Sequence, residues 1–363
     1  MQKTEKSKKR VILGMSGGVD SSVAAALLLK EGYEVLGVSM ELYSCDRPLG
    51  KGCCTPADRL DARQVCEQLK IAYDIIDLRP QFKEKVVNYF AEEYSQGRTP
   101  LPCAPCNRDV RFKALLDYAD QAGAYWIATG HYARVQENKD GTFSMLRGVD
   151  PKKDQFYFLW GLGQKEFSRL KLPIGNFKKE EVRQIALDIG LATHSKRDSQ
   201  ELCFVGDDDH AHFLEEHFPE KAFPAGDFVD GDGKKLGRHH GVHAYTIGQR
   251  KRLGVSLGER RYVVRLDAEK NEVELGGRDS LKASGLIAKD VHWILPKSMV
   301  HGPSSMVKIR STHAGVAANL EECGDQLKVS FEQPQEAIAP GQAAVFYQGD
   351  VCLGGGWIEK ALI

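Results

Sequence analysis

Hydrophobic and polar residues follow two different patterns along the chain. In the first half, short β-branched runs alternate with helical patterns, which predicts βαβ units and a mostly parallel sheet. A hairpin is expected over 132–147, with its turn at Asp140 and Gly141. The expected strands are 10–13, 33–40, 72–78 and 125–129, and the expected helices are 21–31, 56–69, 82–94, 110–122, 164–170 and 179–189.

From residue 226 onward, glycine and aspartate separate short strands, which predicts a small β domain followed by a barrel. The expected strands are 262–266, 272–275, 307–310, 328–331 and 343–348. The 363 residues are enough for two or three domains. We predict an α/β fold with a parallel-sheet domain over 1–205, a small β-rich central domain over 206–282 and a C-terminal β-barrel over 283–363.

Composition excludes several classes of protein. No run of about 18 apolar residues is present, so no membrane helix is predicted. The first ten residues are basic and polar, with no apolar stretch behind a cleavage site, so no secretory signal is predicted. We therefore expect a cytoplasmic enzyme with reduced cysteines.

The 50 basic and 50 acidic residues cancel in total but are unevenly spread. Residues 206–230 hold eight acids and one base, whereas residues 231–265 hold nine bases and two acids. A basic stripe of this kind can bind a phosphate backbone. The alternative is the solvated face of a small β domain, which charge alone favours.

The segment SGGVDSS, residues 16–22, follows an apolar strand and opens a helix rich in alanine and leucine. Glycines let a backbone approach a ligand closely, and the N–H groups at the start of a helix point at an anion. The segment lacks the Gly-Lys-Ser/Thr ending of a Walker A loop and is not a G-x-G-x-x-G loop. A simple helix start capped by serine or aspartate is the alternative, but seven such residues in this setting favour a phosphate loop.

The nine cysteines are too sparse for a disulfide scaffold. Cys106 lies in Cys103-x-x-Cys106 and is followed by Arg108, and Cys203 is preceded by basic residues at 196 and 197. Because a reactive thiolate needs a partly exposed, electropositive setting, Cys106 and Cys203 are the candidate nucleophiles. The cysteines expected to be packing residues are Cys66, Cys323 and Cys352.

These segments resemble those of known enzymes. SGGVDSS is similar to the signature of the N-type ATP pyrophosphatases, and the chain resembles the bacterial tRNA-specific 2-thiouridylases along nearly its whole length. The resemblance implies an adenine nucleotide α-hydrolase-like fold for the first domain. The matching segments are GMSGGVDSS (14–22), PCNRDVRF (105–112), ATGHYAR (128–134), KKDQFYFL (152–159), DSQELCFVG (198–206), YTIGQRK (245–251) and PGQAAVFY (340–347).

The resemblance implies that ATP adenylates O2 of the wobble uridine of a tRNA, and that sulfur then replaces this oxygen. An anticodon loop is already unpaired, so its base is the cheaper one to extrude. The implied cofactors are ATP and Mg²⁺, with Asp20 suited to the metal and Ser22 among the residues that hold the phosphates. The implied ATP-binding residues are Gly14, Met15, Ser16, Gly17, Gly18, Val19, Asp20, Ser21, Met40 and Gly130.

By the same resemblance, Cys203 would carry a persulfide received from a cysteine desulfurase or a sulfur-relay protein. Cys106 would release that sulfur as hydrosulfide or close a transient disulfide with Cys203. The implied partners are tRNA and the sulfur donor, with no membrane and a monomeric free protein. The implied tRNA-binding residues are Leu101, Pro102, Cys103, His131, Lys153, Asp154, Gln155, Arg310, Ser311 and Gln342.

One position departs from the family pattern. Relatives commonly have Asn-Pro-Asp where this chain has Leu101-Pro102-Cys103, so an acid–base role does not carry over to position 103. The change makes Cys103, Cys106 and Cys203 a candidate ligand set for an iron–sulfur cluster, which we rank behind the persulfide route. A zinc site is a weaker option. The sequence assigns no role to Cys45, Cys53 and Cys54.

Two other function classes stay open. Another ATP pyrophosphatase could amidate or ligate a small metabolite, although it would need neither a basic β domain nor a cysteine pair. A tRNA-binding or sulfur-carrier protein with a degenerate loop is the non-enzymatic alternative, although the intact 16–22 segment argues against it.

Overall fold

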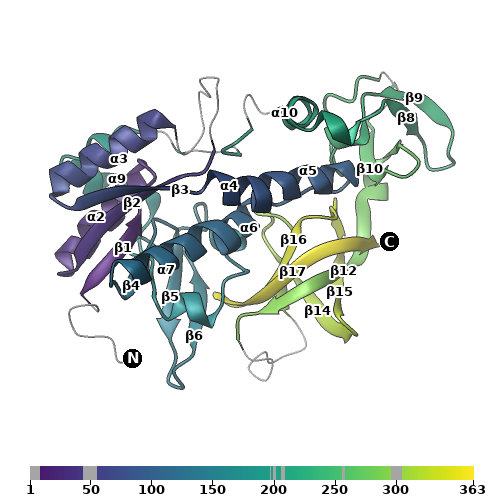
Figure 1. The fold of residues 1–363 in the computed structure, drawn as a ribbon. Helices are drawn as coiled ribbons and strands as arrows, with labels where there is room; N and C mark the ends of the chain where they lie inside the picture. The colour runs from purple at the N-terminus through teal and green to yellow at the C-terminus, as the bar shows by residue number, and fades with distance from the viewer. Residues whose placement is uncertain are drawn as a thin grey trace. The chain divides into compact units, whose positions relative to one another are not determined.

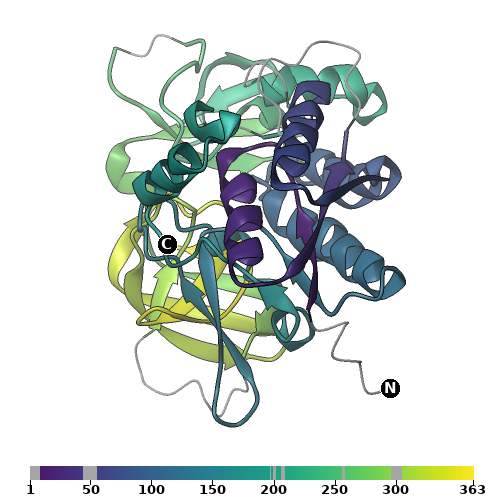
Figure 2. The ribbon, with the colours of Figure 1, turned by 90° about the vertical axis from the view of Figure 1, so that its left-hand side faces the viewer.

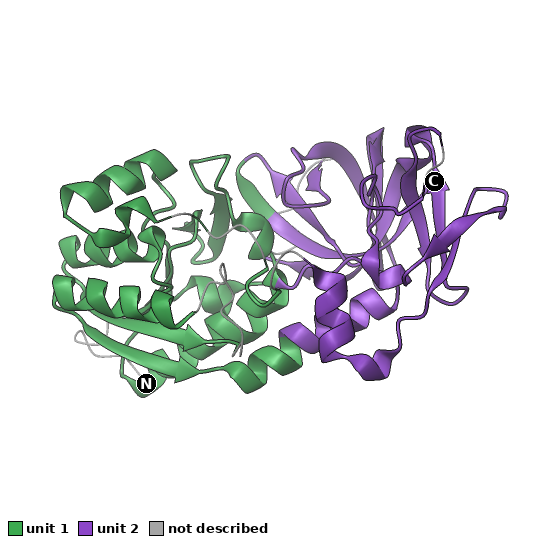
Figure 3. Cartoon of the chain, turned by 90° about the horizontal axis from the view of Figure 1, so that it is seen from above, with its two compact units in different colours: residues 1–85, 103–208, 350–352 green, residues 86–102, 209–349, 353–363 purple. Residues whose placement is uncertain are grey.

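The structure, a computed structural model, describes residues 9–43, 55–196, 198, 202–205, 209–255, 258–295 and 305–363. The chain forms two compact units (Figure 3). Unit 1 comprises residues 1–85, 103–208 and 350–352, and unit 2 comprises residues 86–102, 209–349 and 353–363. Within the described residues, no helix combines the length and the apolar character that a membrane crossing requires. Cys45, Cys53 and Cys54 lie outside the described residues.

A five-stranded sheet forms the centre of unit 1, with the order β3-β2-β1-β4-β7 and parallel pairing throughout. The predicted helix over 164–170 is wrong at its end, because α8 (Gln164–Phe167) stops and the buried Leu170 pairs with Ile127 at the sheet edge. The strands are β1 (Arg10–Gly14), β2 (Glu34–Glu41), β3 (Ala72–Asp77), β4 (Trp126–Ala128) and β7 (Leu170–Lys171).

Helices cover both faces of this sheet (Figure 1). On one face, α2 (Val19–Lys30) contacts both α3 (Pro56–Leu69) and α9 (Lys179–Asp188) and lies between them in Figure 2. On the other face, α7 (Phe112–Gln121) packs against β1 and β4. The predicted parallel sheet is confirmed, and the structure adds that helices pack on both of its faces.

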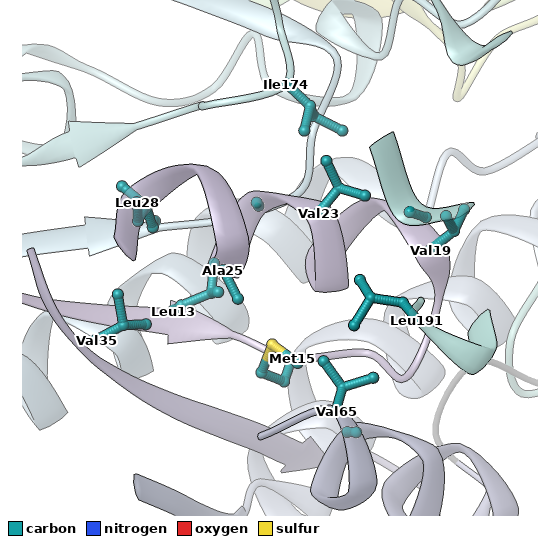
Figure 4. Close-up of a cluster of buried hydrophobic side chains, with 14 of the residues drawn as sticks. Leu13, Met15, Val19, Val23, Ala25, Leu28, Val35, Val65, Ile174 and Leu191 are labelled. Atoms are coloured by element: carbon teal, nitrogen blue, oxygen red, sulfur yellow. The ribbon is translucent and has the colours of Figure 1, made fainter. Parts of the chain in front are cut away.

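The core of unit 1 fills the space between β1 and the three helices on one face (Figure 4). Val11 and Leu13 are two residues apart in β1, so their side chains lie on the same face of the sheet. Both are fully buried in this cluster. Val19 and Val23 of α2 belong to the same cluster, so their burial fixes the position of the start of α2 relative to β1.

The rest of unit 1 consists of short elements and the predicted hairpin, which is confirmed: β5 pairs with β6 in antiparallel register. Residues 350–352, at the start of β17, also belong to unit 1, and Val351 pairs with Leu146 of β6. The short elements are α4 (Arg79–Phe82), η1 (Lys83–Val87, whose last two residues are counted in unit 2), α6 (Cys103–Pro105), η2 (Cys106–Arg111), β5 (Ala133–Glu137), β6 (Phe143–Arg147), η3 (Phe156–Phe158) and η4 (Ala192–Ser195).

Unit 2 is mainly β-structure, as predicted. One sheet has the order β10-β11-β8-β9, and six strands in the order β12-β15-β14-β13-β16-β17 close through a β12–β17 pairing into a barrel. The strands are β8 (Gly226–Val229), β9 (Lys235–His239), β10 (Tyr262–Asp267), β11 (Glu272–Gly276), β12 (Lys282–Trp293), β13 (Ser305–Lys308), β14 (Val316–Cys323), β15 (Gln326–Glu336), β16 (Ala343–Gln348) and β17 (Val351–Leu362). The helices are α5 (Asn88–Ser95), α10 (His210–His217), η5 (Pro219–Lys221), η6 (Val242–Ala244) and η7 (Arg278–Leu281).

Two cysteine predictions are confirmed and one is wrong. Cys66 and Cys352 are fully buried, as expected of packing residues. Cys323 is exposed, because it pairs with Gln326 beside the turn that joins β14 to β15, where the hairpin leaves the core.

Candidate active site

The phosphate loop, residues 16–22, connects β1 to α2 and is shaped by its own serines. Ser21 Oγ and Ser22 Oγ donate hydrogen bonds to the carbonyl oxygen of Gly18 at 3.1 and 2.9 Å. Gly18 is the N-cap of α2, and no side chain caps it. The loop therefore presents the first backbone N–H groups of a 12-residue helix, which is an arrangement suited to a phosphate.

Two glycines are required by close backbone approach. Gly17 has φ +71°, and a Cβ atom there would lie 2.0 Å from the carbonyl oxygen of Asp58. Gly130 follows β4, and its Cβ would lie 2.7 Å from the backbone nitrogen of Ser21 in the first turn of α2. Any side chain at either position would displace the phosphate loop.

The loop and Gly130 meet where ligands bind in open α/β sheets. The strand order reverses between β1 and β4, and the crevice at the carboxyl ends of two such strands is the usual binding place. The Met40 side chain reaches the same edge, with its Cε atom 3.6 Å from the Cβ position of Gly14. The structure thus brings together the predicted nucleotide residues of the loop, Met40 and Gly130.

A buried lysine that the sequence did not single out links this loop to the segment that precedes Cys203. Lys179 is 8% exposed, and its Nζ donates to both carboxylate oxygens of Asp20 at 2.8 Å. The same Nζ lies 2.9 Å from Asp198 Oδ1. The Tyr132 hydroxyl donates to Asp20 at 2.8 Å, and burial together with the Asp20 charge raises the pKa of Tyr132.

Asp198 is held by several cations at once. Lys153 Nζ lies 2.6 Å from Asp198 Oδ2, and Arg183 donates to Oδ1 at 2.8 Å. Burial acts to raise the pKa of Asp198, but the hydrogen bonds from Lys153 and Lys179 outweigh it and lower that pKa. The carboxylate therefore stays ionised and keeps its segment attached to α9.

Lys196 makes a second link between that segment and the phosphate loop. Its Nζ donates to the carbonyl oxygen of Gly17 at 3.0 Å, to Asp58 at 2.7 Å and to Asp61 at 2.5 Å. Burial acts to lower the pKa of Lys196, but its bonds to the two aspartates outweigh this and raise it. The ammonium ion is thus retained beside the loop.

Beyond these links, the chain reaches Cys203 and then packs against α4. Cys203 is partly exposed and lies in a turn closed by the hydrogen bond from the Val205 N–H to the Leu202 carbonyl oxygen, at 3.2 Å. Phe204 is buried, and its ring centroid lies 5.6 Å from that of Phe82. Phe82 ends α4, and α4 packs against η2, which begins at Cys106.

The remaining predicted thiols lie on α6 and η2. Cys106 is 6% exposed, and Cys103 is partly exposed. The next residue, Asn107, donates from Nδ2 to the carbonyl oxygen of Phe158 at 3.1 Å and so fixes the start of η2. Across the described part of the chain, no three His, Cys, Asp or Glu side chains are grouped so that they could hold a metal ion. The Cys103, Cys106 and Cys203 cluster therefore finds no support in the geometry.

The predicted tRNA residues of unit 1 have internal partners. Besides the bond of Lys153 to Asp198, Gln155 Oε1 accepts from the Tyr132 N–H at 3.0 Å, and Asp154 Oδ1 accepts from the Gly148 N–H at 3.2 Å. His131 Nδ1 lies 2.8 Å from Thr129 Oγ1. These contacts orient the residues but leave their role toward tRNA a prediction.

In unit 2, the predicted tRNA residue Gln342 is held in place by two hydrogen bonds. Its Nε2 donates to the carbonyl oxygens of Thr99 and Pro100 at 3.2 and 3.1 Å, which ties it to the segment that continues into the buried Leu101 and Pro102. Arg310 donates to the carbonyl oxygen of Glu336 at 3.2 Å, and Ser311 is exposed.

The basic stripe is partly neutralised within its own domain. Asp227 pairs with Lys235 and Arg238 at 2.8 and 3.1 Å, and Arg265 pairs with Glu274 at 2.9 Å. Residues 250–252, Arg-Lys-Arg, are exposed. Three consecutive exposed bases of this kind are able to contact a phosphate backbone.

Comparisons with known proteins agree over the whole chain. The family model "tRNA methyl transferase HUP domain" matches residues 9–207, "tRNA methyl transferase PRC-barrel domain" matches residues 211–277, and "Aminomethyltransferase beta-barrel domain" matches residues 283–358. The curated "tRNA-specific 2-thiouridylase MnmA" of Carboxydothermus hydrogenoformans is 47% identical over 361 residues, covering 98% of this chain and 99% of that protein.

Relatives from other bacteria match equally broadly. The proteins of the same name from Solibacter usitatus and Geobacter metallireducens are 44% and 43% identical. Their alignments cover 96% and 99% of this chain, and 99% of each relative. Identities of this size over almost the full length of both chains show the relationship directly: the chain belongs to the tRNA-specific 2-thiouridylase family.

Proposed function

We propose that this enzyme converts the wobble uridine of tRNA to 2-thiouridine, with ATP as co-substrate and Cys203 as the sulfur carrier. One observation carries the proposal. The segment from Lys196 to Phe204 is bound at its start to the phosphate loop and packs at its end on α4, next to the helix of Cys106. The described residues of this segment therefore link the proposed nucleotide site to the two candidate thiols.

In the first step, uridine O2 attacks the α-phosphorus of ATP, so that an O–P bond forms and the bond to pyrophosphate breaks. The N–H groups at the start of α2 would hold the phosphates, and Gly130 would leave room beside them. Mg²⁺ would neutralise phosphate charge, and the Asp20 carboxylate suits it, provided that Lys179 yields at least one of the two oxygens it now holds.

In the second step, the terminal sulfur of a persulfide on Cys203 attacks C2, and the C2–O bond to AMP breaks. The Cys106 thiolate then attacks Cys203 Sγ. The sulfur–sulfur bond of the persulfide breaks, its terminal sulfur remains on C2 as the thiocarbonyl, and a Cys106–Cys203 disulfide forms that an external thiol must reduce. If Cys106 attacks first, hydrosulfide is released and attacks C2 itself. No step is routed through an iron–sulfur cluster.

Binding of tRNA would use both units. We propose contacts from His131 and from the 153–155 segment, Lys-Asp-Gln, in unit 1. In unit 2 we propose contacts from Arg310, Ser311 and Gln342, with residues 101–103 meeting the target base. The domains would be 1–205, 206–282 and 283–363, the free protein a monomer, and the sulfur donor a cysteine desulfurase or a relay protein.

Single-turnover assays with labelled ATP test the proposal. AMP and pyrophosphate should appear only when unmodified tRNA is present, and Cys203→Ser should retain this activity while forming no 2-thiouridine. Cys323→Ser, which removes an exposed thiol elsewhere, is the matched control and should behave as the unaltered enzyme. Stimulation by an amino acid or a nucleotide instead of tRNA would favour a small-metabolite pyrophosphatase. A loss of tRNA affinity without a loss of turnover in Asp20→Ala would favour a tRNA-binding protein.

A further inference from the structure

The helix that begins at Cys106 has an unusual register. Residues Cys106–Arg111 form the π-helix η2, and the Phe112 N–H that ends it bonds to the carbonyl oxygen of Asn107, five residues back. In an α-helix, residues i and i+5 point about 140° apart. A π turn brings them onto one side, and such turns occur frequently at functional sites.

In this register, the guanidinium group of Arg111 contacts the sulfur of Cys106, the predicted nucleophile. Arg111 Nε donates a hydrogen bond to Cys106 Sγ at 3.3 Å. Because an arginine side chain is protonated at any accessible pH, it favours the thiolate of a cysteine that it contacts. The contact depends on the π register, so sequence spacing alone would not have revealed it.

Cys66 shows how burial changes the pKa of a thiol in this protein when burial is the dominant influence. Burial, with a smaller contribution from the Glu67 charge, raises the pKa of Cys66 to about 12. Cys106 is almost as buried, at 6% exposure against 0% for Cys66. A Cys106 thiol would be unreactive at neutral pH if burial alone acted on it.

Other charged groups near η2 point to different partners. Arg108 pairs with Asp109 at 2.8 Å, and on neighbouring helices Arg79 of α4 and Lys113 of α7 pair with Asp77 and Asp117. α6, which also packs against η2, carries the second thiol, Cys103.

His131 also faces this guanidinium. Its ring stacks near Phe112, with 5.9 Å between centroids, and burial together with the Arg111 charge lowers the pKa of His131 to about 4. The imidazole is therefore neutral near pH 7, and the positive charge beside the sulfur belongs to Arg111.

We propose that Arg111 is a positioning residue that holds Cys106 as a thiolate in the resting enzyme, through the π-helical register of η2. The inference rests on the proposed function, which requires a Cys106 thiolate to attack the sulfur on Cys203. Formation of the thiolate only releases a proton to solvent, so no oxidant or further reactant is involved.

The test is a pH titration of the reduced full-length protein without ATP, tRNA or sulfur donor. Thiolate absorbance near 240 nm is recorded for the unaltered protein and for Cys106→Ser, and their difference isolates Cys106. We expect an inflection below the ordinary thiol value of about 8.5. Arg111→Gln should move it upward by about one to three pH units, the usual effect of an opposite charge in contact, and Arg111→Lys should restore part of the shift.

Arg108→Gln is the matched control, because it removes the same charge from the same helix but from an exposed side chain. It should leave the inflection unchanged. An inflection at or above 8.5 in the unaltered protein, or equal effects of Arg108→Gln and Arg111→Gln, would overturn the inference. The unaltered protein suffices for the first criterion even if Arg111→Gln does not fold. Because the titration uses no substrate, failure of the proposed thiolation would show in the turnover assays and not here.

Discussion

Lys179→Met removes the ammonium group that joins the phosphate loop to the Asp198 segment. Lys179 is 8% exposed, and its Nζ lies 2.8 Å from both oxygens of Asp20 and 2.9 Å from Asp198. Methionine keeps most of the side-chain length, so the change mainly leaves two carboxylates without their shared cation. Tyr132 still donates to Asp20, and Lys153 and Arg183 still hold Asp198.

The expected loss of stability follows from the burial of the partners. Removing one partner of a fully buried ion pair costs about 3–5 kcal/mol, whereas an exposed pair contributes about 0–1 kcal/mol. The side chains of Asp20 and Asp198 are 30% and 21% exposed. An intermediate loss of about 2 kcal/mol is therefore expected, which is roughly a 30-fold change in a local opening equilibrium.

Hydrogen exchange measured by mass spectrometry suits this prediction, because it reports local opening and does not require the two units to unfold together. Backbone amides of α2 and α9 should exchange roughly 30-fold faster in Lys179→Met, while those of the C-terminal barrel should not change. Lys178→Met alters the exposed neighbour and serves as the control.

Adding Asp20→Asn to Lys179→Met should recover a large part of the loss, since it neutralises one of the two carboxylates that have lost their shared cation. Two results would refute the reasoning: a single variant as mild as Lys178→Met, or a double variant that is no more stable than the single one.

Three other outcomes follow from the geometry. Gly130→Ala should disrupt the phosphate loop and abolish ATP-dependent AMP release, since its Cβ would lie 2.7 Å from Ser21 N, whereas Gly18→Ala, whose Cβ meets no atom closer than 3.4 Å, should still fold with native circular dichroism; similar spectra with full activity in Gly130→Ala would contradict this. His131 has its pKa lowered to about 4, so the stability that its neutral form contributes is present above about pH 6.5 and is lost as the pH falls toward 4; His131→Gln should make the melting temperature less sensitive to acid over that window. Reversal of the three charges at 250–252 should weaken tRNA binding and flatten its dependence on salt, and an unchanged salt slope would identify these residues as ordinary solvated surface.

Local signals explain which parts of the fold could be predicted. The predicted bounds of helix α3 match the observed ones, and the structure shows at its start a cap formed by Thr55 and Pro56, a signal that acts within a few residues. The two-residue strand β7 was missed because its conformation depends on pairing with β4, which the surrounding sequence does not encode. Cys323 was misjudged for the same reason, since its exposure depends on where the hairpin turns.

The same distinction applies to the candidate site. The glycines, serines and aspartate of the 16–22 segment are themselves a helix-start signal, so its place at the start of α2 could be predicted from these residues alone. Lys178 and Lys179 are adjacent and look alike in sequence, yet only the packing of α9 on the phosphate loop makes Lys179 buried and Lys178 exposed. The contact of Arg111 with Cys106 could not be predicted from the sequence, because it occurs within a π-helical turn.

Nucleoside mass spectrometry detects the proposed product, 2-thiouridine, in the tRNA itself. Unmodified tRNA is incubated with the purified protein, ATP, Mg²⁺ and a persulfide donor, then digested and analysed. We predict 2-thiouridine at the wobble position. It should form only when ATP is present, and it should not form with Cys203→Ser. Uridine that stays unmodified under all these conditions, or a methylated uridine in place of the thiolated one, would contradict this prediction.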